Sequence, residues 1–393
     1  MTGALNERHN DKDHDIDEGY GARLTIDLQA LADNWRVMRD RSHPARCAAV
    51  IKADGYGIGA PEVATTLYAA GCRDFFVATA REGAIIRVYA PQARIFVMNC
   101  ILPGIEETCR AAELVPVLAS MEHVAIWTNA CIANGDHPCA LQVDTGMNRL
   151  GITSEEALSI AGDVTRPAGF SPVLLMSHLA CGDTPDHPLN HHQLEAFRAA
   201  VGAFDGVEAS LSNSAGVLLG PEYRFDLTRP GIMLFGGSVG DGVNTITRPV
   251  VTAEARIITI RHAKRGETVS YGATVTLERD SRIAICSIGY ADGYPRSLSG
   301  SGVPLRNAVR DGAHAFAAGQ RLPLLGRVTM DMTAFDITDL PDNTLRAGDF
   351  VELFGKNVAL DDVARAGGTI GYELLTSLGQ RYRRHCLPAE NED

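Results

Sequence analysis

The chain has 393 residues, of which 45% are hydrophobic, and its net charge is −12 at pH 7. This length exceeds the usual size of a single compact domain, although one α/β barrel alone can reach about 250 residues. The excess of 48 acidic over 36 basic residues argues against a general nucleic-acid binder, which needs a basic face.

The first 22 residues, MTGALNERHNDKDHDIDEGYGA, are polar and acidic. They lack the apolar core of a secretory signal and the acid-poor character of a transit peptide. We interpret residues 1–22 as a disordered polar tail. No apolar run approaches the roughly 20 residues of a membrane span, so we expect no membrane association. The nine scattered cysteines form no CxxC pair, which favours reduced thiols and a cytoplasmic protein.

After the tail, short apolar runs alternate with helical segments. Asp27 can cap a helix whose apolar residues share one face, among them Leu31 and Trp35. Eight apolar runs then recur about every 20–35 residues, which is the spacing of βα units. Buried strands with helical crossovers predict a (β/α)8 TIM-type barrel over residues 23–245. The runs are AAVI (48–51), FFVAT (75–79), RIFVM (94–98), LVPVL (114–118), CALQVD (139–144), PVLLMSH (172–178), EASLSN (208–213) and FDLTRPGIML (225–234).

The pattern changes near Arg248. The runs that follow are rich in β formers, are separated by glycine and proline, and have no clear helix between them. We therefore predict a mainly β C-terminal domain over residues 246–393, with one helix in YELLTSLGQRY (372–382). The runs are VVTAEARIITI (250–260), TVSYGATVTL (268–277), SRIAICSIGY (281–290), TMDMTAFDIT (329–338) and DFVELFG (349–355).

Polar side chains follow several of the barrel strands, at the end where barrel enzymes hold their active sites. Lys52 follows the first strand and Tyr56 comes four residues later. Arg149 follows the fifth strand, and His178 ends the sixth. An unpaired lysine is costly to bury, so Lys52 at the end of a buried strand is a candidate functional residue.

The loops after strands seven and eight are where barrels usually bind phosphate. Ser214 offers a hydroxyl in the first loop, and Gly231 allows close approach of the backbone in the second. Arg229 and Ile232 flank that glycine. A lysine amine, a phosphate site and a nearby arginine together suggest pyridoxal 5'-phosphate, which binds a lysine as a Schiff base.

Nine motifs, spread in order from about Arg23 to Tyr382, resemble those of bacterial alanine racemases. The resemblance implies an α/β barrel followed by a β domain, in agreement with the pattern of the runs. It implies an isomerase that interconverts L- and D-alanine with pyridoxal phosphate. The motifs are AVIKADGYGIGA (49–60), VDTGMNRLG (143–151), SHLA (177–180), NSAG (213–216), RPGI (229–232), VSYGAT (269–274), IGYADGYPR (288–296), GRVTMDM (326–332) and IGYELLT (370–376).

By this resemblance, Lys52 binds the cofactor and is one base, and Tyr271 is the second base on the opposite face of the substrate. Racemisation removes a proton from one face of Cα and returns one to the other, so two bases suit it. The resemblance assigns the proton of L-alanine to Tyr271 and that of D-alanine to Lys52. His178 is expected to contact Tyr271 or Arg229. Arg229 is expected to face the pyridine nitrogen and, since a guanidinium keeps its proton, to leave that nitrogen unprotonated.

The resemblance also implies the binding residues. The cofactor phosphate is expected at Tyr56, Ser214, Gly231, Ile232 and Tyr372. Arg149 and the backbone near Met330 are expected to bind the substrate carboxylate, while Tyr290 and Tyr372 narrow the entrance so that a methyl side chain fits. In the family, a homodimer shares its two sites, and the partner subunit supplies Tyr271, Tyr290, Met330 and Asp331. Positions at the family's entrance match Arg296, Arg327, Asp183 and Ile370.

One position departs from the family pattern. Many members have a carbamylated lysine seven residues before the carboxylate-binding arginine, and here that position is Gln142. A glutamine can accept a hydrogen bond from a guanidinium but brings no negative charge. We therefore expect no carbamylated lysine and no dependence on bicarbonate at this position.

Other functions remain open at the level of the residues. A related racemase could act on serine or on larger amino acids. A barrel-fold amino-acid decarboxylase would not need Tyr271, and a non-catalytic cofactor-binding barrel would lack the β domain. His187, His191 and His192 have no HExxH motif or cysteine partner, so we expect no metal site. The sequence also leaves open whether D-alanine is made for peptidoglycan or alanine is catabolised.

Overall fold

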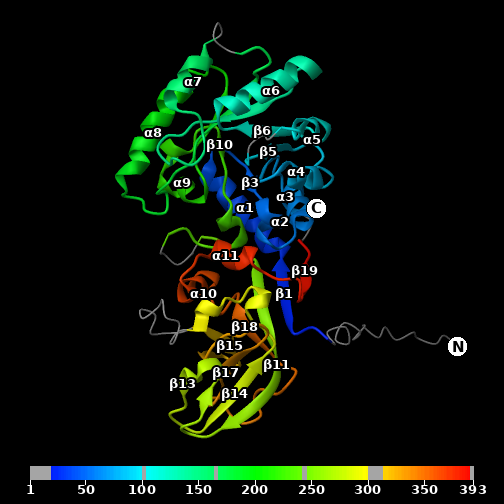
Figure 1. Cartoon of the computed structure of the whole chain (residues 1–393), viewed down its shortest axis with the longest axis vertical. Coiled ribbons are helices and arrows are strands. Elements are labelled where there is room, and N and C mark those ends of the chain that lie inside the picture. The colour runs from blue at the N-terminus through cyan, green and yellow to red at the C-terminus, as the bar shows by residue number, and fades with distance from the viewer. Residues whose placement is uncertain (1–18, 100–102, 163–166, 241–245, 300–312, 390–393) are drawn as a thin grey trace, which may run out of the picture. The chain divides into compact units, whose positions relative to one another are not determined.

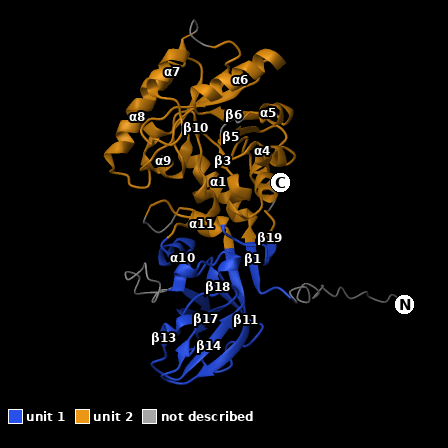
Figure 2. Ribbon diagram, viewed as in Figure 1, with its two compact units in different colours: residues 1–25, 252–368, 377–385 blue, residues 26–251, 369–376, 386–393 orange. Residues whose placement is uncertain are grey.

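The structure is a computed structural model that describes residues 19–99, 103–162, 167–240, 246–299 and 313–389. It divides into two compact units (Figure 2). Unit 1 comprises residues 1–25, 252–368 and 377–385, and unit 2 comprises residues 26–251, 369–376 and 386–393. Most of the predicted tail, residues 1–18, lies outside the described residues.

Unit 2 is built on parallel strands in chain order (Figure 1). Every pair in its seven-stranded sheet is parallel, as expected for βα units. The strands are β3 (Ala49–Val50), β4 (Asp74–Val77), β5 (Arg94–Val97), β6 (Leu114–Leu118), β7 (Cys139–Gln142), β8 (Pro172–Met176) and β9 (Glu208–Ser210).

An eighth strand closes this sheet into a barrel. The strand β10 (Leu227–Thr228) pairs in parallel with β2 (Arg46–Cys47), which runs into β3 after one residue. On its other side, the amide of Arg229 donates to the carbonyl of Ser212, 2.8 Å away, beyond the end of β9. The eighth strand therefore pairs with the first and the seventh strands, which confirms the predicted barrel.

Helices join the strands and lie outside them (Figure 1). The predicted cap is confirmed: the Asp27 carboxylate accepts from the amide of Ala30 at 2.8 Å, and the buried face of this first helix includes Leu31 and Trp35. The helices of unit 2 are α1 (Leu28–Ser42), α2 (Lys52–Tyr56), α3 (Ala60–Ala69), α4 (Ala80–Arg87), α5 (Glu106–Ala111), α6 (Met121–Asn134), α7 (Ser154–Ala161), α8 (Pro188–Val201), α9 (Ser214–Leu219), η3 (Pro221–Tyr223), η4 (Ile232–Phe235) and α11 (Gly371–Thr376).

Unit 1 holds an eight-stranded sheet in the order β14-β17-β16-β15-β18-β11-β1-β19, with a small β12–β13 hairpin beside it. The predicted β character of this unit is confirmed. The strands are β1 (Ala22–Asp27), β11 (Val251–Ala263), β12 (Thr268–Val269), β13 (Val275–Thr276), β14 (Ser281–Cys286), β15 (His314–Ala317), β16 (Gln320–Leu325), β17 (Thr333–Asp336), β18 (Phe350–Phe354) and β19 (Tyr382–Leu387). The helices are η5 (Tyr271–Ala273), η6 (Tyr290–Asp292), η7 (Arg296–Ser299) and α10 (Leu360–Gly367).

The structure corrects one element and adds others. The helix predicted for 372–382 occupies Gly371–Thr376 instead, and Tyr382 begins strand β19. The strands β1, β15 and β16 and the helix α10 were not predicted. Within the described residues, no helix is long and apolar enough to cross a membrane. The eight cysteines in this part of the chain are all free thiols, and Cys100 lies outside it.

Candidate active site

Lys52 lies where the first barrel strand ends. The strand residues Ala49 and Val50 are buried, whereas Lys52 is exposed at the barrel mouth. The next five residues, 53–57, all have positive φ angles between 55° and 83°, so α2 is a left-handed turn. Through this turn the chain passes from the exposed Lys52 to the buried Tyr56 within four residues.

Tyr56 forms one wall of a cradle with Gly231 and Ser214. Its ring stacks on Phe235 at 4.5 Å between centroids, and the ring centroid of Tyr372 lies 6.1 Å away. A Cβ on Gly231 would lie 2.3 Å from the Tyr56 hydroxyl, so only glycine permits this approach. The Ser214 hydroxyl accepts from the Gly231 amide at 2.8 Å. Burial raises the pKa of Tyr56, so its hydroxyl stays protonated and can donate a hydrogen bond.

Arg229 is buried below this cradle, in the barrel. One of its amino groups donates to the carbonyl of Ser177 at 2.6 Å, and the other donates to the Ser210 hydroxyl. Burial lowers the pKa of Arg229 to about 9, so the guanidinium still holds its proton at neutral pH. Arg229 therefore offers a fixed cationic donor inside the barrel.

The mouth of the barrel is strongly cationic. Burial lowers the pKa of His178 to about 3, and the charges of Arg229, Arg149 and Lys52 act in the same direction. Burial also lowers the pKa of Lys52, as does the charge of Arg149, while Glu82 raises it. His178 is therefore neutral near pH 7. The surrounding cations suit a phosphate or a carboxylate.

Arg149 stands on a tightly folded loop after β7. The side-chain amide of Gln142 donates to the backbone carbonyl of Leu150 at 2.9 Å. The Asp144 carboxylate accepts from the backbone amide of Gly146 at 2.8 Å. A glutamine at position 142 could accept a hydrogen bond from the Arg149 guanidinium, but the described residues show no such hydrogen bond. Gln142 instead fixes the backbone one residue beyond Arg149.

Sequence reasoning missed the polar residues that support His178. Gln193 on α8 is fully buried, donates to the His178 carbonyl at 2.9 Å and accepts from the Ala180 amide at 2.8 Å. It also donates to the Thr145 hydroxyl at 3.2 Å. In the sequence, the only local signal for this supporting role of Gln193 is a polar residue on the apolar face of helix α8. His187, in contrast, caps α8 by accepting from the Leu189 amide at 3.2 Å.

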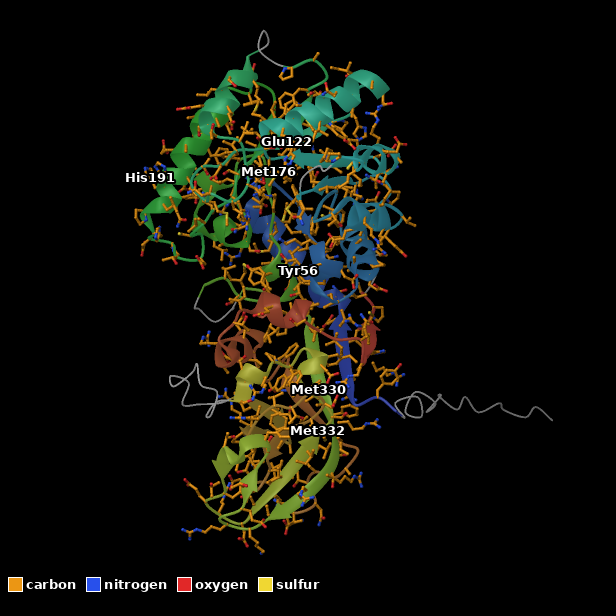
Figure 3. All side chains as sticks on the ribbon, viewed as in Figure 1. Tyr56, Glu122, Met176, His191, Met330 and Met332 are labelled. Atoms are coloured by element: carbon orange, nitrogen blue, oxygen red, sulfur yellow. The ribbon has the colours of Figure 1, made fainter. Side chains whose placement is uncertain are left out.

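The four remaining predicted residues line one cavity in unit 1, of about 640 Å³. Two of them are unusually exposed for large apolar or aromatic side chains: Tyr271 is 72% exposed and Met330 is 53% exposed. Met330 is labelled in Figure 3. The cavity is lined by Val269, Ser270, Tyr271, Ile285, Tyr290, Arg296, Arg327, Val328, Thr329, Met330, Asp331, Met332, Thr333 and Ala334. Two predicted entrance positions, Arg296 and Arg327, also line this cavity. The methionine and threonine residues beside Met330 and Asp331 extend the set that the sequence predicted.

Arg381 holds two of the cavity's loops. Its guanidinium binds both oxygens of the buried Asp292 carboxylate, at 2.5 and 2.9 Å, and one oxygen of Asp331 at 2.7 Å. Asp292 ends the turn that carries Tyr290, and the amide of Ala291 in that turn donates to the Met330 carbonyl at 3.1 Å. The resemblance did not include Arg381.

The predicted residues thus form two groups, one in each unit. In unit 2, the residues fit pyridoxal phosphate: they supply the amine of Lys52, the protonated hydroxyl of Tyr56, the glycine-dependent cradle and the buried Arg229. That cofactor needs an amine for its aldehyde, donors for its phosphate and a partner for its ring nitrogen. In unit 1, aromatic and methionine side chains around a small cavity fit a small organic substrate.

Sequence comparison matches both parts of the chain to known families. Residues 26–239 match the family described as alanine racemase, N-terminal domain. Residues 250–386 match the family described as alanine racemase, C-terminal domain.

Individual relatives are similar over nearly their full length. A biosynthetic alanine racemase of Agrobacterium fabrum is 57% identical over 391 residues and is covered completely. A catabolic alanine racemase of the same organism is 42% identical over 94% of this chain and 93% of its own. The crystal structure of alanine racemase from Bartonella henselae with covalently bound pyridoxal phosphate is 35% identical, with a TM-score of 0.85 over 93% of this chain and 99% of that one.

Proposed function

Since the chain belongs to the alanine racemase family, and is thereby a pyridoxal-phosphate-dependent isomerase of alanine, we propose that Lys52 and Tyr271 are the two bases that interconvert L- and D-alanine. One observation carries most of the weight. The amine of Lys52 follows the end of the first barrel strand, in the same unit as a cradle that a Cβ at Gly231 would fill.

Pyridoxal phosphate, when bound, withdraws electrons from Cα and so acidifies the hydrogen of the substrate. The amine of Lys52 would hold the cofactor. Tyr56, Ser214, Gly231 and Ile232 would hold its phosphate, with Tyr372 beside them. Arg229 would be the partner of the ring nitrogen. Because this guanidinium keeps its proton at neutral pH, it would donate a hydrogen bond there and take no proton away.

Two bases on opposite faces move the protons. Tyr271 Oη removes the proton from Cα of L-alanine, and Lys52 Nζ delivers a proton to the other face; the reverse direction exchanges these roles. Burial and the charge of Arg149 lower the pKa of Lys52, which increases its fraction of free amine near neutral pH. The cations around His178 stabilise a phenolate brought among them, which supports a tyrosine as the second base.

Arg149 and the backbone near Met330 bind the substrate carboxylate, while Tyr290 and Asp331 bound the space around it. Tyr290 and Tyr372 limit the side chain to about the size of a methyl group. The relatives are named for alanine, so the comparisons do not favour the alternative of a broader racemase.

The active unit in this proposal is a homodimer with two shared sites. Tyr271 and Met330 are largely exposed within one chain, although apolar and aromatic side chains of this size are usually buried. A partner subunit that covers them would complete each site with Lys52 of the other chain. We also propose a cytoplasmic location, since the reduced thiols suit a reducing compartment.

Gln142 makes a separate prediction. Its amide binds the Leu150 carbonyl, so the Arg149 loop is fixed without an added negative charge. We expect the activity to be the same in bicarbonate-free and bicarbonate-containing buffer, and the intact mass to show no carbamate. A carbamate on some other lysine that contacts Arg149 would contradict this prediction.

A biosynthetic role is supported by the 57% identical relative that bears this description. We therefore expect the gene to restore growth without D-alanine in a bacterium that lacks its own racemases. Failure of a well-expressed, active protein to do so would leave the catabolic role.

The function is tested with a D-amino-acid oxidase-coupled assay on L-alanine, L-serine and L-lysine. We expect turnover of alanine above the others. Lys52→Ala should abolish both activity and the absorbance of the lysine-bound cofactor. Absorbance that persists in this variant would move the covalent link to another lysine, and cofactor binding without turnover of alanine would refute the proposed reaction.

A further inference from the structure

The left-handed turn after Lys52 needs support from outside itself. Left-handed backbone is unfavourable for residues with a side chain, and Ala53, Asp54 and Tyr56 all adopt it, with φ angles of 55°, 55° and 56°. Such a conformation persists only where surrounding contacts determine it. Since the turn begins at Lys52, those contacts also decide where its amine stands.

The far end of the turn is well fixed. The Asp54 carboxylate accepts from the amide of Ala60 at 2.8 Å. Gly57 packs so closely that a Cβ there would lie 2.3 Å from the Leu375 carbonyl oxygen. Both contacts lie beyond Lys52, on the side of Tyr56.

The near end of the turn is held by Glu82 of helix α4. Its Oε1 accepts from the amide of Ala53, the residue after Lys52, at 2.9 Å. Its Oε2 accepts from the amides of Ala78 and Thr79 at 2.7 and 3.3 Å. One carboxylate therefore ties the end of the first barrel strand to the end of the second, because Ala78 directly follows β4.

Glu82 also supplies a negative charge beside a cluster of cations. Burial and Arg149 lower the pKa of Lys52, and Glu82 opposes both. Because the two oxygens are used by backbone amides, the carboxylate is held in place rather than free to turn toward a cation.

We propose that Glu82 is a positioning residue for Lys52: through the amide of Ala53 it fixes the start of the left-handed turn, and it holds a negative charge in a fixed place beside the lysine. This inference rests on the proposed role of Lys52 as the residue that binds the cofactor. It predicts that one substitution at Glu82 changes two separable properties of Lys52.

The chain offers a matched control on helix α7. Glu156 forms the same capping arrangement as Glu82. Its carboxylate accepts from the backbone amide of Thr153 at 2.8 Å, and the Thr153 hydroxyl accepts from the backbone amide of Glu156 at 3.1 Å. Thr79 and Glu82 do likewise on α4, at 3.3 and 3.2 Å. Glu156 is not among the charges that shift the pKa of Lys52. Glu156→Gln therefore removes the same charge from an equivalent capping position without touching the proposed mechanism.

The test follows the covalent re-attachment of pyridoxal phosphate to the full-length chain after its removal with hydroxylamine. The rate of re-attachment rises with pH as the amine of Lys52 loses its proton, and the midpoint reports its pKa. Relative to the parent, Glu82→Gln should lower the midpoint by about half a pH unit, because a negative charge is lost. It should also lower the high-pH plateau several-fold, because the amide of Ala53 loses a charged acceptor. Glu156→Gln should leave both unchanged.

A second variant keeps the charge. Glu82→Asp is one methylene shorter and cannot hold Ala53 and Ala78 together, so it should lower the plateau while keeping the midpoint near that of the parent. An unchanged midpoint in Glu82→Gln, an equal shift in Glu156→Gln, or a parental plateau in Glu82→Asp would overturn the proposal. These outcomes are distinct from failure of the proposed function, which would appear as cofactor absorbance in Lys52→Ala.

Discussion

Lys52 and Tyr271 need opposite support from their surroundings if both are to act as bases. A lysine must be able to lose its proton, which burial and the positive charge of Arg149 favour by lowering the pKa of Lys52. A tyrosine base must be able to carry a negative charge, which nearby cations favour. In the proposed homodimer, the cluster of Lys52, Arg149 and Arg229 around a neutral His178 would support both bases.

Tyr271→Phe separates the two bases. The equilibrium between the enantiomers is fixed, so a loss in kcat/KM must be equal in both directions and cannot identify the face. The face is identified by measuring, for each enantiomer, the exchange of the Cα hydrogen with deuterium from deuterium oxide. In this variant we expect racemisation to fall by at least about 10³-fold, because a general base is lost. D-alanine should still take up deuterium, because Lys52 remains, whereas L-alanine should not. Uptake into L-alanine alone would reverse the assignment of the two faces.

His178 predicts a pH dependence of stability. Its pKa is about 3 in the folded protein against an ordinary value near 6.5, so the unfolded chain binds more protons between these values. The folded state therefore loses stability as pH falls below about 6.5. From pH 6.5 to 5.5, this group alone removes about 1 kcal/mol. Thermal or urea unfolding should show that His178→Asn loses less stability than the parent over this interval, and an equal loss would contradict the shift.

At the level of residues, the sequence predicts which residues form the site better than it predicts their backbone conformation. Lys52, Tyr56, Ser214 and Gly231 follow from strand ends and motifs, and the structure brings them to one mouth of the barrel. The left-handed turn between the first two has no local signal, because Ala53 and Asp54 favour other backbone conformations. Its supports, Glu82 and Leu375, lie far away along the chain.

The elements of the barrel were predictable because each strand is a buried apolar run with a turn on either side. The strand β1 could not be predicted in this way, because its partner strands β11 and β19 lie more than 200 residues later in the chain. The strand β16 contains Pro323, which argues against a central strand. The domain ranges 1–22, 23–245 and 246–393 stay predictions. They assign residues 23–25 differently from the compact units, because β1 joins the sheet of unit 1. They also place residues 246–251, 369–376 and 386–393 in the C-terminal domain, whereas these residues belong to unit 2.

Arg381 makes a prediction about how the elements of unit 1 present the cavity. Arg381→Lys removes the planar guanidinium that binds the carboxylates of Asp292 and Asp331 at the same time. A lysine cannot make the two parallel hydrogen bonds to Asp292. We expect a stability loss of about 1–2 kcal/mol, reduced from the value for buried pairs because Arg381 is half exposed. The KM for alanine should rise several-fold, because the loops of Tyr290 and Met330 loosen.

The control for Arg381 lies in the same unit. Arg279 binds both oxygens of Asp339 at 2.5 and 2.7 Å, but both side chains are exposed and neither lines the cavity. Arg279→Lys should leave KM unchanged and stability nearly so. If both lysine variants raise KM alike, Arg381 has no particular role in holding the cavity.

At the scale of the whole molecule, the two groups of site residues belong to different compact units of one chain. In our proposal, exposed Tyr271 and Met330 beside a cavity form one half of a racemase site, and Lys52 beside the Gly231 cradle forms the other. A homodimer that joins the halves reciprocally would make two sites and would bury the apolar side chains that each chain leaves open. It would also explain why neither half is closed by its own unit.

The central claim is that the two bases come from different chains, and a mixed dimer tests it most directly. Lys52→Ala and Tyr271→Phe chains with different tags are co-expressed, and the dimer that carries both tags is purified. Each parent dimer should be nearly inactive. In the mixed dimer, one site combines both defects and the other has intact Lys52 and Tyr271, so we predict about half the activity of the unmodified dimer. A mixed dimer as inactive as its parents would place both bases on one chain and contradict the account.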